Sequence, residues 1–554
     1  MGISKICLTA VLLASSLSAS SDTDSKGHAL YMMQNSDIET ALQAYQNYFV
    51  KTGHHDFEVI QRMGQVLFRH GIQSDDPTIF TMTLFGAGLS GSAEALEILE
   101  KGLIHPDPQI QMIALHFIAQ SNDDQSDELF NRAMSSDFLS TRLEAAYYMA
   151  QKKHPRAVGQ IEGLMFRLPP IFRPLFPSLF ALIGTSEATA ALRRLLDDLE
   201  PQVRIESILN IARLGRDDLL PALRKQLTHS NIAELEACAY AIGTLKDSSS
   251  IAKLKKLAHS PSENVKIAAI LALNTLGDRT NLLQLTTLAE SHNTYAIAAL
   301  GQIPGSEETL AKLAHSPDLQ TRLNAAVSLL QRRDERCLEG IQELLIRDER
   351  DLAFYPLPSI GRTMAIWKAV PSAELRSKDQ TLDLSLSLSM REQILRESIY
   401  LPPSEFLKIA ELIIEKQQND LIPCLISLLK DLRTPEIIDL LKKGCARFDV
   451  PFIRDYCHLA LFDLKEEGPY GEYIKHWVIR QKDAELIRLR PMLPWKMRLD
   501  SNYTLTPDET SRLLIETFLA LASDRNIEFL VEAILLGNPQ NRYALFGLLM
   551  RATE

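Results

Sequence analysis

Cysteines, aromatic residues and basic residues are all scarce in this sequence. Six of the 554 residues are cysteine, 7% are aromatic, and 59 Lys and Arg face 70 Asp and Glu, for a formal net charge of −11. The acidic balance argues against binding along a nucleic-acid backbone, which needs clustered Lys and Arg. The cysteines beyond residue 20 are widely spaced and odd in number, so they form no disulfide framework and match no zinc spacing, although one bridge stays open. They are Cys238, Cys337, Cys424, Cys445 and Cys457.

Motifs for catalysis and for cofactors are also missing. The sequence has no P-loop, no His-Glu-x-x-His and no Ser/His/Asp arrangement, and the pair His54-His55 has no partner motif, so we expect no catalytic, metal or cofactor site. Gly86-Ala-Gly88-Leu-Ser-Gly91 does match the G-x-G-x-x-G pattern, and residues 78–85 before it resemble a strand. A dinucleotide fold needs alternating strands and helices, whereas the sequence up to Leu330 shows only helical periodicity. We expect a glycine-rich turn between paired helices.

No segment after residue 20 is long and apolar enough to cross a membrane. Residues 164–183 come closest, but Arg167, Arg173 and several prolines interrupt them. At the start of the chain, Lys5 precedes a short apolar run and small residues near position 20, which is the pattern of a secretion signal. We therefore expect residues 1–20 to be a signal peptide and the protein to be exported from a bacterial cell, into the periplasm or cell envelope or beyond. A buried N-terminal helix is the alternative.

One short pattern returns throughout Asp107 to Leu330. In each copy an acidic residue in a turn is followed by an alanine-rich helix. A polar or basic residue stands at the start of that helix, and we call its place the slot position. Successive slot positions differ by 31, 31, 31, 30 and 32 as far as Lys266, and the last interval of 56 fits two copies with a degenerate one near Tyr295. A nearly fixed period of this length indicates a solenoid. The slot residues are Gln111, Arg142, Arg173, Arg204, Glu234, Lys266 and Arg322.

Each copy of the pattern contains two helices. Residues 248–258 have apolar residues at helical spacing, His259-Ser-Pro-Ser262 ends them, and a second helix runs from Val265 to Leu276; residues 308–330 repeat this arrangement. The predicted fold is therefore all-α, an α-solenoid of stacked antiparallel helix pairs. We expect a helical cap over 21–76, the repeat array over 77–350, an irregular insertion over 351–400 and further helical repeats over 401–554.

The repeat resembles HEAT repeats, and more narrowly the short bacterial HEAT-like units of the phycobilin-lyase type. The resemblance rests on Asp107-Pro-x-Ile-Gln111, on Asp318-x-x-Thr-Arg322 and on the alanine-rich second helices. It implies a structural ladder in which turn acids pair with slot bases of neighbouring units. Its members are Asp107, Asp137, Arg142, Arg204, Lys266, Asp318 and Arg322. The alternative is that these bases, together with Arg173, form a stripe that binds an acidic partner. The repeat specifies fold far better than function.

Two later stretches differ from the array. Thr381 to Leu388 alternates with period 2, which predicts a strand that either packs on the solenoid or offers an edge to a partner. Arg480 to Arg498 carries an excess of basic residues and is flanked by tryptophans, so it could bind a protein, phosphate groups or lipid heads, or be a solvated helix face. The candidate partner-binding residues are Arg480, Arg488, Arg490, Trp477 and Trp495.

The sequence thus favours a protein-binding scaffold that uses the concave face of a solenoid and performs no chemistry. We expect protein partners of unknown identity and no nucleic acid, and the oligomeric state stays open. One alternative is a membrane-surface or lipid adaptor that uses the tryptophan-flanked basic region. The other is an enzyme or chromophore-attachment factor of the bilin-lyase type, which only the resemblance suggests.

Overall fold

The computed structural model describes most of the chain from residue 25 onward. The described residues are 25–92, 94–121, 125–228, 231–347, 352–357, 362–368, 380–480, 489–491, 505–507, 513, 516–517, 520–521 and 527–553. They fall into two compact units. Unit 1 holds the described residues up to Ala145, those from Asp455 to Pro491 and those after residue 501, and unit 2 holds those from Ala146 to Arg454. The boundaries fall inside α8 (Leu139–Gln151) and α26 (Pro451–Asp463).

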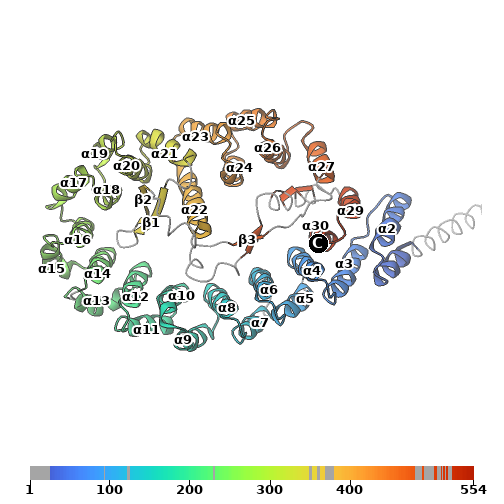
Figure 1. Cartoon of the computed structure of the whole chain (residues 1–554), viewed down its shortest axis with the longest axis horizontal. Helices are drawn as coiled ribbons and strands as arrows, with labels where there is room; N and C mark the ends of the chain where they lie inside the picture. Colours follow the sequence, from blue (N-terminus) through green and yellow to red (C-terminus); the bar gives the residue numbers. More distant parts are fainter. Residues whose placement is uncertain are drawn as a thin grey trace, which may run out of the picture. The chain divides into compact units, whose positions relative to one another are not determined.

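Unit 2 is a row of antiparallel helix pairs, as the period predicts (Figure 1). The second helices of consecutive pairs contact one another in order, from α12 to α20. The first helices, some with a short 3-10 turn before them, are α9 (Ala157–Arg167), α11 (Ser186–Leu195), α13 (Leu220–Gln226), α15 (Ile251–Leu257), α17 (Leu282–Glu290) and α19 (Glu307–Leu313). The second helices are α10 (Phe176–Ile183), α12 (Pro201–Arg213), α14 (Ile232–Thr244), α16 (Glu263–Thr275), α18 (Thr294–Leu300) and α20 (Leu319–Gln331).

Small residues let the second helices approach closely. A β-carbon at Gly243 of α14 would lie 2.7 Å from the Cα of Ala272 in α16, and Ala268 and Ala269 of α16 are fully buried. Helix α14 begins at a polar cap: Asn231 Oδ1 accepts from the backbone N–H of Ala233 at 3.0 Å, which satisfies a donor left unpaired at the helix start. The alanine-rich second helix of the sequence is therefore the contact that stacks one pair on the next.

Helices continue beyond the array, with one hairpin between them. They are α21 (Leu338–Ile346), α22 (Gln380–Ser398), α23 (Pro403–Glu415), α24 (Ile422–Leu432) and α25 (Pro435–Cys445). Strands β1 (Leu352–Leu357) and β2 (Arg362–Lys368) pair antiparallel, with a bulge between Tyr355 and Leu357 where Pro356 has no N–H to give. The hairpin packs on the solenoid, because β2 contacts α18 and α20 and β1 contacts α22.

The strand predicted over Thr381 to Leu388 is wrong, because these residues lie in α22. Their alternation is made of leucine and serine, and leucine is a good helix former, whereas β-branched and aromatic residues favour strands. Only Thr381 in the run is of that kind. The observed strands contain Phe354, Tyr355 and Trp367, so side-chain type predicts strands here better than alternation does.

Unit 1 brings helices from near the two ends of the described chain together (Figure 1). Helix α30 packs on α3 and α4, and α29 packs on α2 and α27. Besides a helix over 25–34, the elements are α2 (Ile38–Thr52), α3 (Phe57–Gly71), α4 (Pro77–Ser90), α5 (Ala95–Leu103), α6 (Pro108–Gln120), α7 (Gln125–Ala133), α27 (Tyr470–Arg480), β3 (Leu489–Pro491), β4 (Leu505–Pro507), α29 (Ile527–Leu536) and α30 (Asn541–Ala552). Strands β3 and β4 form a short antiparallel pair.

The G-x-G-x-x-G segment is mostly helix, which corrects the expected glycine-rich turn. Gly86 and Gly88 lie inside α4, and only Gly91 is in the turn, where its φ of +70° ends the helix. A β-carbon at Gly88 would collide with the Phe117 ring, and one at Gly86 would collide with the backbone carbonyl of Tyr543. Close helix packing therefore accounts for both helical glycines. Within the described residues no helix is long and apolar enough to cross a membrane.

Candidate functional site

Two slot arginines, Arg204 and Arg322, tie neighbouring helices together with the same geometry. Arg204 Nη1 donates to the carbonyls of Asp198 (2.6 Å) and Leu199 (3.0 Å), and its Nε donates to Glu234 at 3.1 Å. Arg322 Nη1 donates in the same way to the Ser316 carbonyl at 2.8 Å. Its Nε and Nη2 donate to Glu343 at 2.8 and 3.0 Å. These guanidinium groups are occupied within the fold, so they are not free to grip a partner.

The carboxylates that pair with Arg204 and Arg322 do not come from the turn acids. This corrects the expected pairing of turn acids with slot bases. Asp107 and Asp318 cap their own helices instead: Asp107 Oδ1 accepts from the N–H of Gln109 at 2.8 Å, and Asp318 accepts from the N–H and hydroxyl of Thr321 at 2.8 and 2.6 Å. Those bonds from Thr321 lower the pKa of Asp318. An aspartate shortly before a slot residue is thus already engaged at the helix start.

Glu234 is not a slot residue, although the sequence spacing placed it there. Helices α12, α14 and α16 begin at positions 201, 232 and 263, which are equally spaced, so Leu235 is the position equivalent to Arg204 and Lys266. Glu234 occupies the preceding position, which Val203 and Val265 fill in the neighbouring helices, and all three side chains are fully buried. A carboxylate has replaced a valine and bonds the arginine of the preceding repeat.

The remaining ladder positions show no common partner. Gln111 Nε2 donates to the His105 carbonyl at 2.7 Å, and Gln111 Oε1 accepts from the Ser136 hydroxyl at 2.8 Å, so this side chain makes a neutral version of the same tie. Arg142 has a buried Nε for which the described residues offer no hydrogen-bond acceptor. Lys266 is half-buried and Asp137 is exposed. The acidic-partner stripe stays a prediction for Arg142 and Lys266.

A second ladder, which the sequence analysis missed, joins the first helices of unit 2. Arg193, Arg224 and Lys255 recur at equal spacing near the ends of α11, α13 and α15. Each pairs with an aspartate at the start of the next unit, namely Asp218 (3.6 Å), Asp247 (2.8 Å) and Asp278 (2.9 Å). Hydrogen bonds from Arg224 and from Lys255 lower the pKa values of Asp247 and Asp278. The equal spacing of these three basic residues in the sequence is the signal that could have revealed this ladder.

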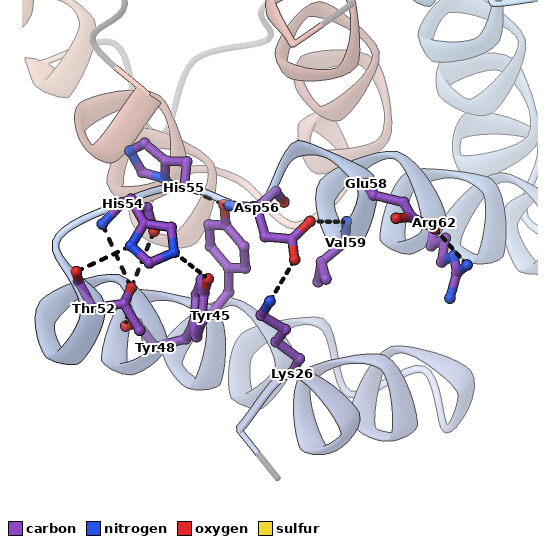
Figure 2. Close-up of polar contacts among 10 residues, drawn as sticks. All are labelled: Lys26, Tyr45, Tyr48, Thr52, His54, His55, Asp56, Glu58, Val59 and Arg62. Atoms are coloured by element: carbon purple, nitrogen blue, oxygen red, sulfur yellow. Dashed lines mark hydrogen bonds and ion pairs between the residues drawn. The ribbon is translucent and has the colours of Figure 1, made fainter. Parts of the chain in front are cut away.

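The pair His54-His55 lies in the corner between α2 and α3 (Figure 2). His54 Nδ1 lies 3.0 Å from the Thr52 carbonyl and its Nε2 lies 3.3 Å from the Tyr48 hydroxyl. His55 stacks on Phe49 with ring centres 4.2 Å apart, and its Nδ1 lies 3.2 Å from the Tyr45 hydroxyl. The two imidazoles serve different tyrosines, and no group of His, Cys, Asp and Glu among the described residues has the arrangement of a metal site.

Asp56 fixes the same corner from the other side, as Figure 2 shows. Its Oδ1 accepts from the N–H of Val59 at 3.2 Å and begins α3, and its Oδ2 accepts from Lys26 Nζ at 2.6 Å. Burial opposes the charge, but these bonds outweigh it and the pKa of Asp56 is lowered. Burial also raises the pKa of Tyr45. The other nitrogen of His55, Nε2, lies 3.1 Å from Glu528 Oε1, so packing, capping and this pair account for the side chains of the corner.

The basic C-terminal region is described only in part. Trp477 lies in α27 with 4% of its surface exposed, so its ring belongs to the core of unit 1 and is not presented to a partner. Arg480 is exposed at the end of α27, with its guanidinium 5.6 Å from the centre of the Tyr473 ring. Arg490 lies in β3, and Arg488 and Trp495 lie outside the described residues. The described part of this region shows no shared exposed surface for the candidates.

The cysteines beyond residue 20 are thiols in this structure. Cys238, Cys337, Cys424 and Cys457 are buried, and Cys445 is half-buried. Burial raises the pKa values of Cys337 and Cys445 to about 12, which makes the reactive thiolate rare at neutral pH.

Comparison with known proteins supports the repeat assignment. Residues 220–299, which span α13 to α18, match the family model of HEAT repeats. No curated protein is similar enough in sequence to count as a relative.

Solved helical structures resemble the chain only loosely. The complex of CpcE and CpcF of phycocyanin lyase from a Nostoc species is 18% identical, with 39% of this chain and 92% of that one covered and a TM-score of 0.30. UNC-45 from Drosophila melanogaster is 13% identical, with 95% and 87% covered and a TM-score of 0.33. Kap121p is 12% identical, with 94% and 78% covered and a TM-score of 0.34. Likeness at this level carries no inference about function.

Proposed function

Because the chain is a helical solenoid built of HEAT repeats, we propose that it is an exported scaffold that binds a protein partner along its second helices. The observation that carries the proposal is the stacking of α12, α14 and α16, whose first residues, Pro201, Ile232 and Glu263, are equally spaced in the sequence. Equivalent side chains therefore recur along a row. Multivalent contact of this kind suits a protein surface, because many modest contacts add up over a large area.

The row offers recurring exposed positions for such contact. Gln202, Ala233 and Asn264 near the starts of the three helices are exposed, and Arg213 and Thr244 at the ends of two of them are exposed as well. Of the residues between them, Leu209 and Leu271 are buried and Tyr240 is half-buried, so the exposed row is mostly polar. A non-obligate protein interface is about as polar as the rest of a protein surface. The hairpin β1–β2 contacts α18 and α20 further along the same row.

Site-specific photo-crosslinking in cells tests the proposal. A photoreactive amino acid would replace Arg213 or Thr244 on second helices, and the matched controls would carry it at Lys225 or Lys256, which are exposed at equivalent places on two first helices. We expect one discrete protein adduct from both second-helix positions and none from the controls. Equal adducts from all four positions, or no protein adduct from the second helices, would refute the proposal.

Export is a separate part of the proposal and rests on Lys5 and the apolar run behind it. The N-terminal sequence of the native protein tests it directly. A start close to residue 21 supports cleavage of a signal peptide, and an intact Met1 refutes it.

A membrane-surface role gains no observation in its favour. Of the residues that suggested it, Trp477 is buried and Arg488 and Trp495 lie outside the described part of the chain. The same holds for chemistry of the bilin-lyase type, because the cluster of His, Tyr and acid at the corner of α2 and α3 is accounted for by capping and packing.

A further inference from the structure

Helix α30 is buried on nearly all sides by elements of unit 1. Leu545, Phe546, Leu548, Leu549 and Met550 are each at most 4% exposed. The helix lies against α3 and α4, which come from near the other end of the sequence (Figure 1). A helix that is apolar all round needs a partner on more than one face. The helices α3 and α4 supply one such face, which we call the α3–α4 groove.

Glycines line this groove where α30 crosses it. A β-carbon at Gly64 of α3 would lie 2.8 Å from Met550 Cγ, and one at Gly71 would lie 2.7 Å from the Tyr543 ring. On the other side of the contact, a β-carbon at Gly547 would lie 2.6 Å from the carbonyl carbon of Gly86. Real β-carbons do not come this close, so the groove accepts only a helix with glycine at the crossing point.

Polar contacts fix the direction and depth of α30 in the groove. Gln61 Nε2 donates to the carbonyl of Met550 at 2.8 Å and to the Thr553 hydroxyl at 3.0 Å. That carbonyl, in the last turn of α30, also accepts from the backbone N–H and the hydroxyl of Thr553, both at 2.9 Å. At the other end, Arg542 Nη2 donates to Glu39 at 2.8 Å and to the Leu535 carbonyl at 3.1 Å. The groove therefore recognises shape in the middle of a helix and polar groups at both ends.

We propose that the α3–α4 groove is a helix-binding site which this chain fills with its own α30, and which takes a helix of a protein partner when α30 leaves. The partner helix would be apolar, with a glycine at its centre and a carbonyl in its last turn that accepts from Gln61. The proposal deepens the proposed protein-binding function and rests on it for its use in the cell. A tethered helix competes at an effective concentration of about millimolar, so binding in trans becomes visible only once α30 is displaced.

Full-length variants separate the groove from its occupant. Gly547→Leu alters α30 and leaves the groove intact, Gly86→Leu blocks the groove itself, and Gly163→Leu is the control, because Gly163 of α9 is exposed and has no atom near its β-carbon position. Arg542→Ala is a second way to loosen α30, since it removes both polar contacts at the start of that helix. The probe is a fluorescent peptide with the native sequence of residues 541–553, and trypsin cleavage within α30 reports whether the helix is displaced.

We expect the peptide to bind the Gly547→Leu chain at least tenfold more tightly than the parent chain, and the Arg542→Ala chain to an intermediate degree. The Gly86→Leu and Gly163→Leu chains should bind it no better than the parent does. Hydrogen exchange over α5 to α7, which belong to unit 1 as the groove does, shows whether that unit is folded in each variant. If the Gly547→Leu chain fails to fold, peptide binding by the Arg542→Ala chain tests the proposal instead.

Three results would overturn the groove: an α30 that stays protected in the Gly547→Leu chain, a displaced α30 without gain in peptide binding, or equal binding by the Gly86→Leu chain. Each is read from the purified chain and the peptide alone. They are therefore distinct from a failure of the scaffold proposal, which is decided by crosslinking on the second helices.

Discussion

Replacing Arg204 by methionine should destabilise the contact between α12 and α14 more than any other single change at a slot position. The Glu234 carboxylate that it pairs with is fully buried, and only 14% of the Arg204 side chain is exposed. Removing one partner of a buried ion pair costs about 3 to 5 kcal/mol, because the other charge is left without compensation. The carbonyls of Asp198 and Leu199 lose their donor as well. We expect a loss of about 3 to 5 kcal/mol in the local free energy of opening.

The double variant Arg204→Met/Glu234→Val isolates the cause. Valine is the residue found at the equivalent positions, Val203 and Val265, so it fits this site without a charge. Replacing both partners of a buried pair by apolar residues is often close to neutral, and we expect the double variant to recover to within about 1 to 2 kcal/mol of the parent chain. The remaining loss comes from the two turn carbonyls.

Hydrogen exchange of the α12 and α14 amides is the suitable assay, because a chain with two compact units need not unfold in one step. Arg216→Met is the control: its ion pair with Asp218 lies at the surface, and we expect little change. The reasoning is refuted if Arg204→Met costs less than about 1 kcal/mol, or if the double variant is as unstable as the single one.

Three further predictions follow from other contacts. Gly86→Ala should destabilise unit 1, because a β-carbon there meets a backbone carbonyl. Gly163→Ala should stabilise its helix by about 0.5 to 1 kcal/mol, because alanine is the better helix former and nothing lies near its β-carbon. Thermal unfolding of both variants checks this, and equal shifts in unfolding temperature would contradict it. The pKa of Asp247 is lowered in the fold, so its pair with Arg224 should stabilise the chain at neutral pH and lose that effect as the pH falls below about 4. The acid-induced loss of protection in α13 should therefore be smaller in Asp247→Asn than in the parent chain, and an identical pH profile would count against the pair. High salt should weaken the pairs of Arg193, Arg224 and Lys255 more than the buried pair of Arg204, which amide exchange at two salt concentrations can compare.

Local patterns in the sequence were enough to predict the helix pairs. The spacing of alanines and of slot residues follows from the way each second helix packs on the next, and that packing recurs at the constant interval of the helix starts. The same reasoning misplaced Glu234 by one position, because Glu234 lies close to the expected spacing whereas the equivalent residue, Leu235, is apolar. Only the observed helix starts show that it occupies a valine position.

Contacts between distant parts of the chain could not be predicted in this way. Gly86 and Gly547 lie near opposite ends of the sequence, and nothing near either glycine indicates the other. The leucine-serine alternation after Thr381 was also ambiguous, since leucine suits a helix as well as a buried strand. The histidine corner illustrates a third limit: the sequence shows His54 and His55 side by side, but their tyrosine partners follow from the turn geometry alone.

The contact of α30 with α3 and α4 is the central claim, because the groove and the glycine at position 86 are both explained by it. Disulfide trapping measures it. The variant Gly64→Cys/Met550→Cys uses a contact in which a β-carbon at position 64 would lie 2.8 Å from Met550 Cγ, the place that a cysteine sulfur at position 550 would take. The control Gln65→Cys/Met550→Cys moves one thiol to the next residue of α3. Under mild oxidation we predict an intrachain disulfide in the first variant and none in the control. Disulfide-linked dimers alone, or no difference between the two variants, would contradict the account.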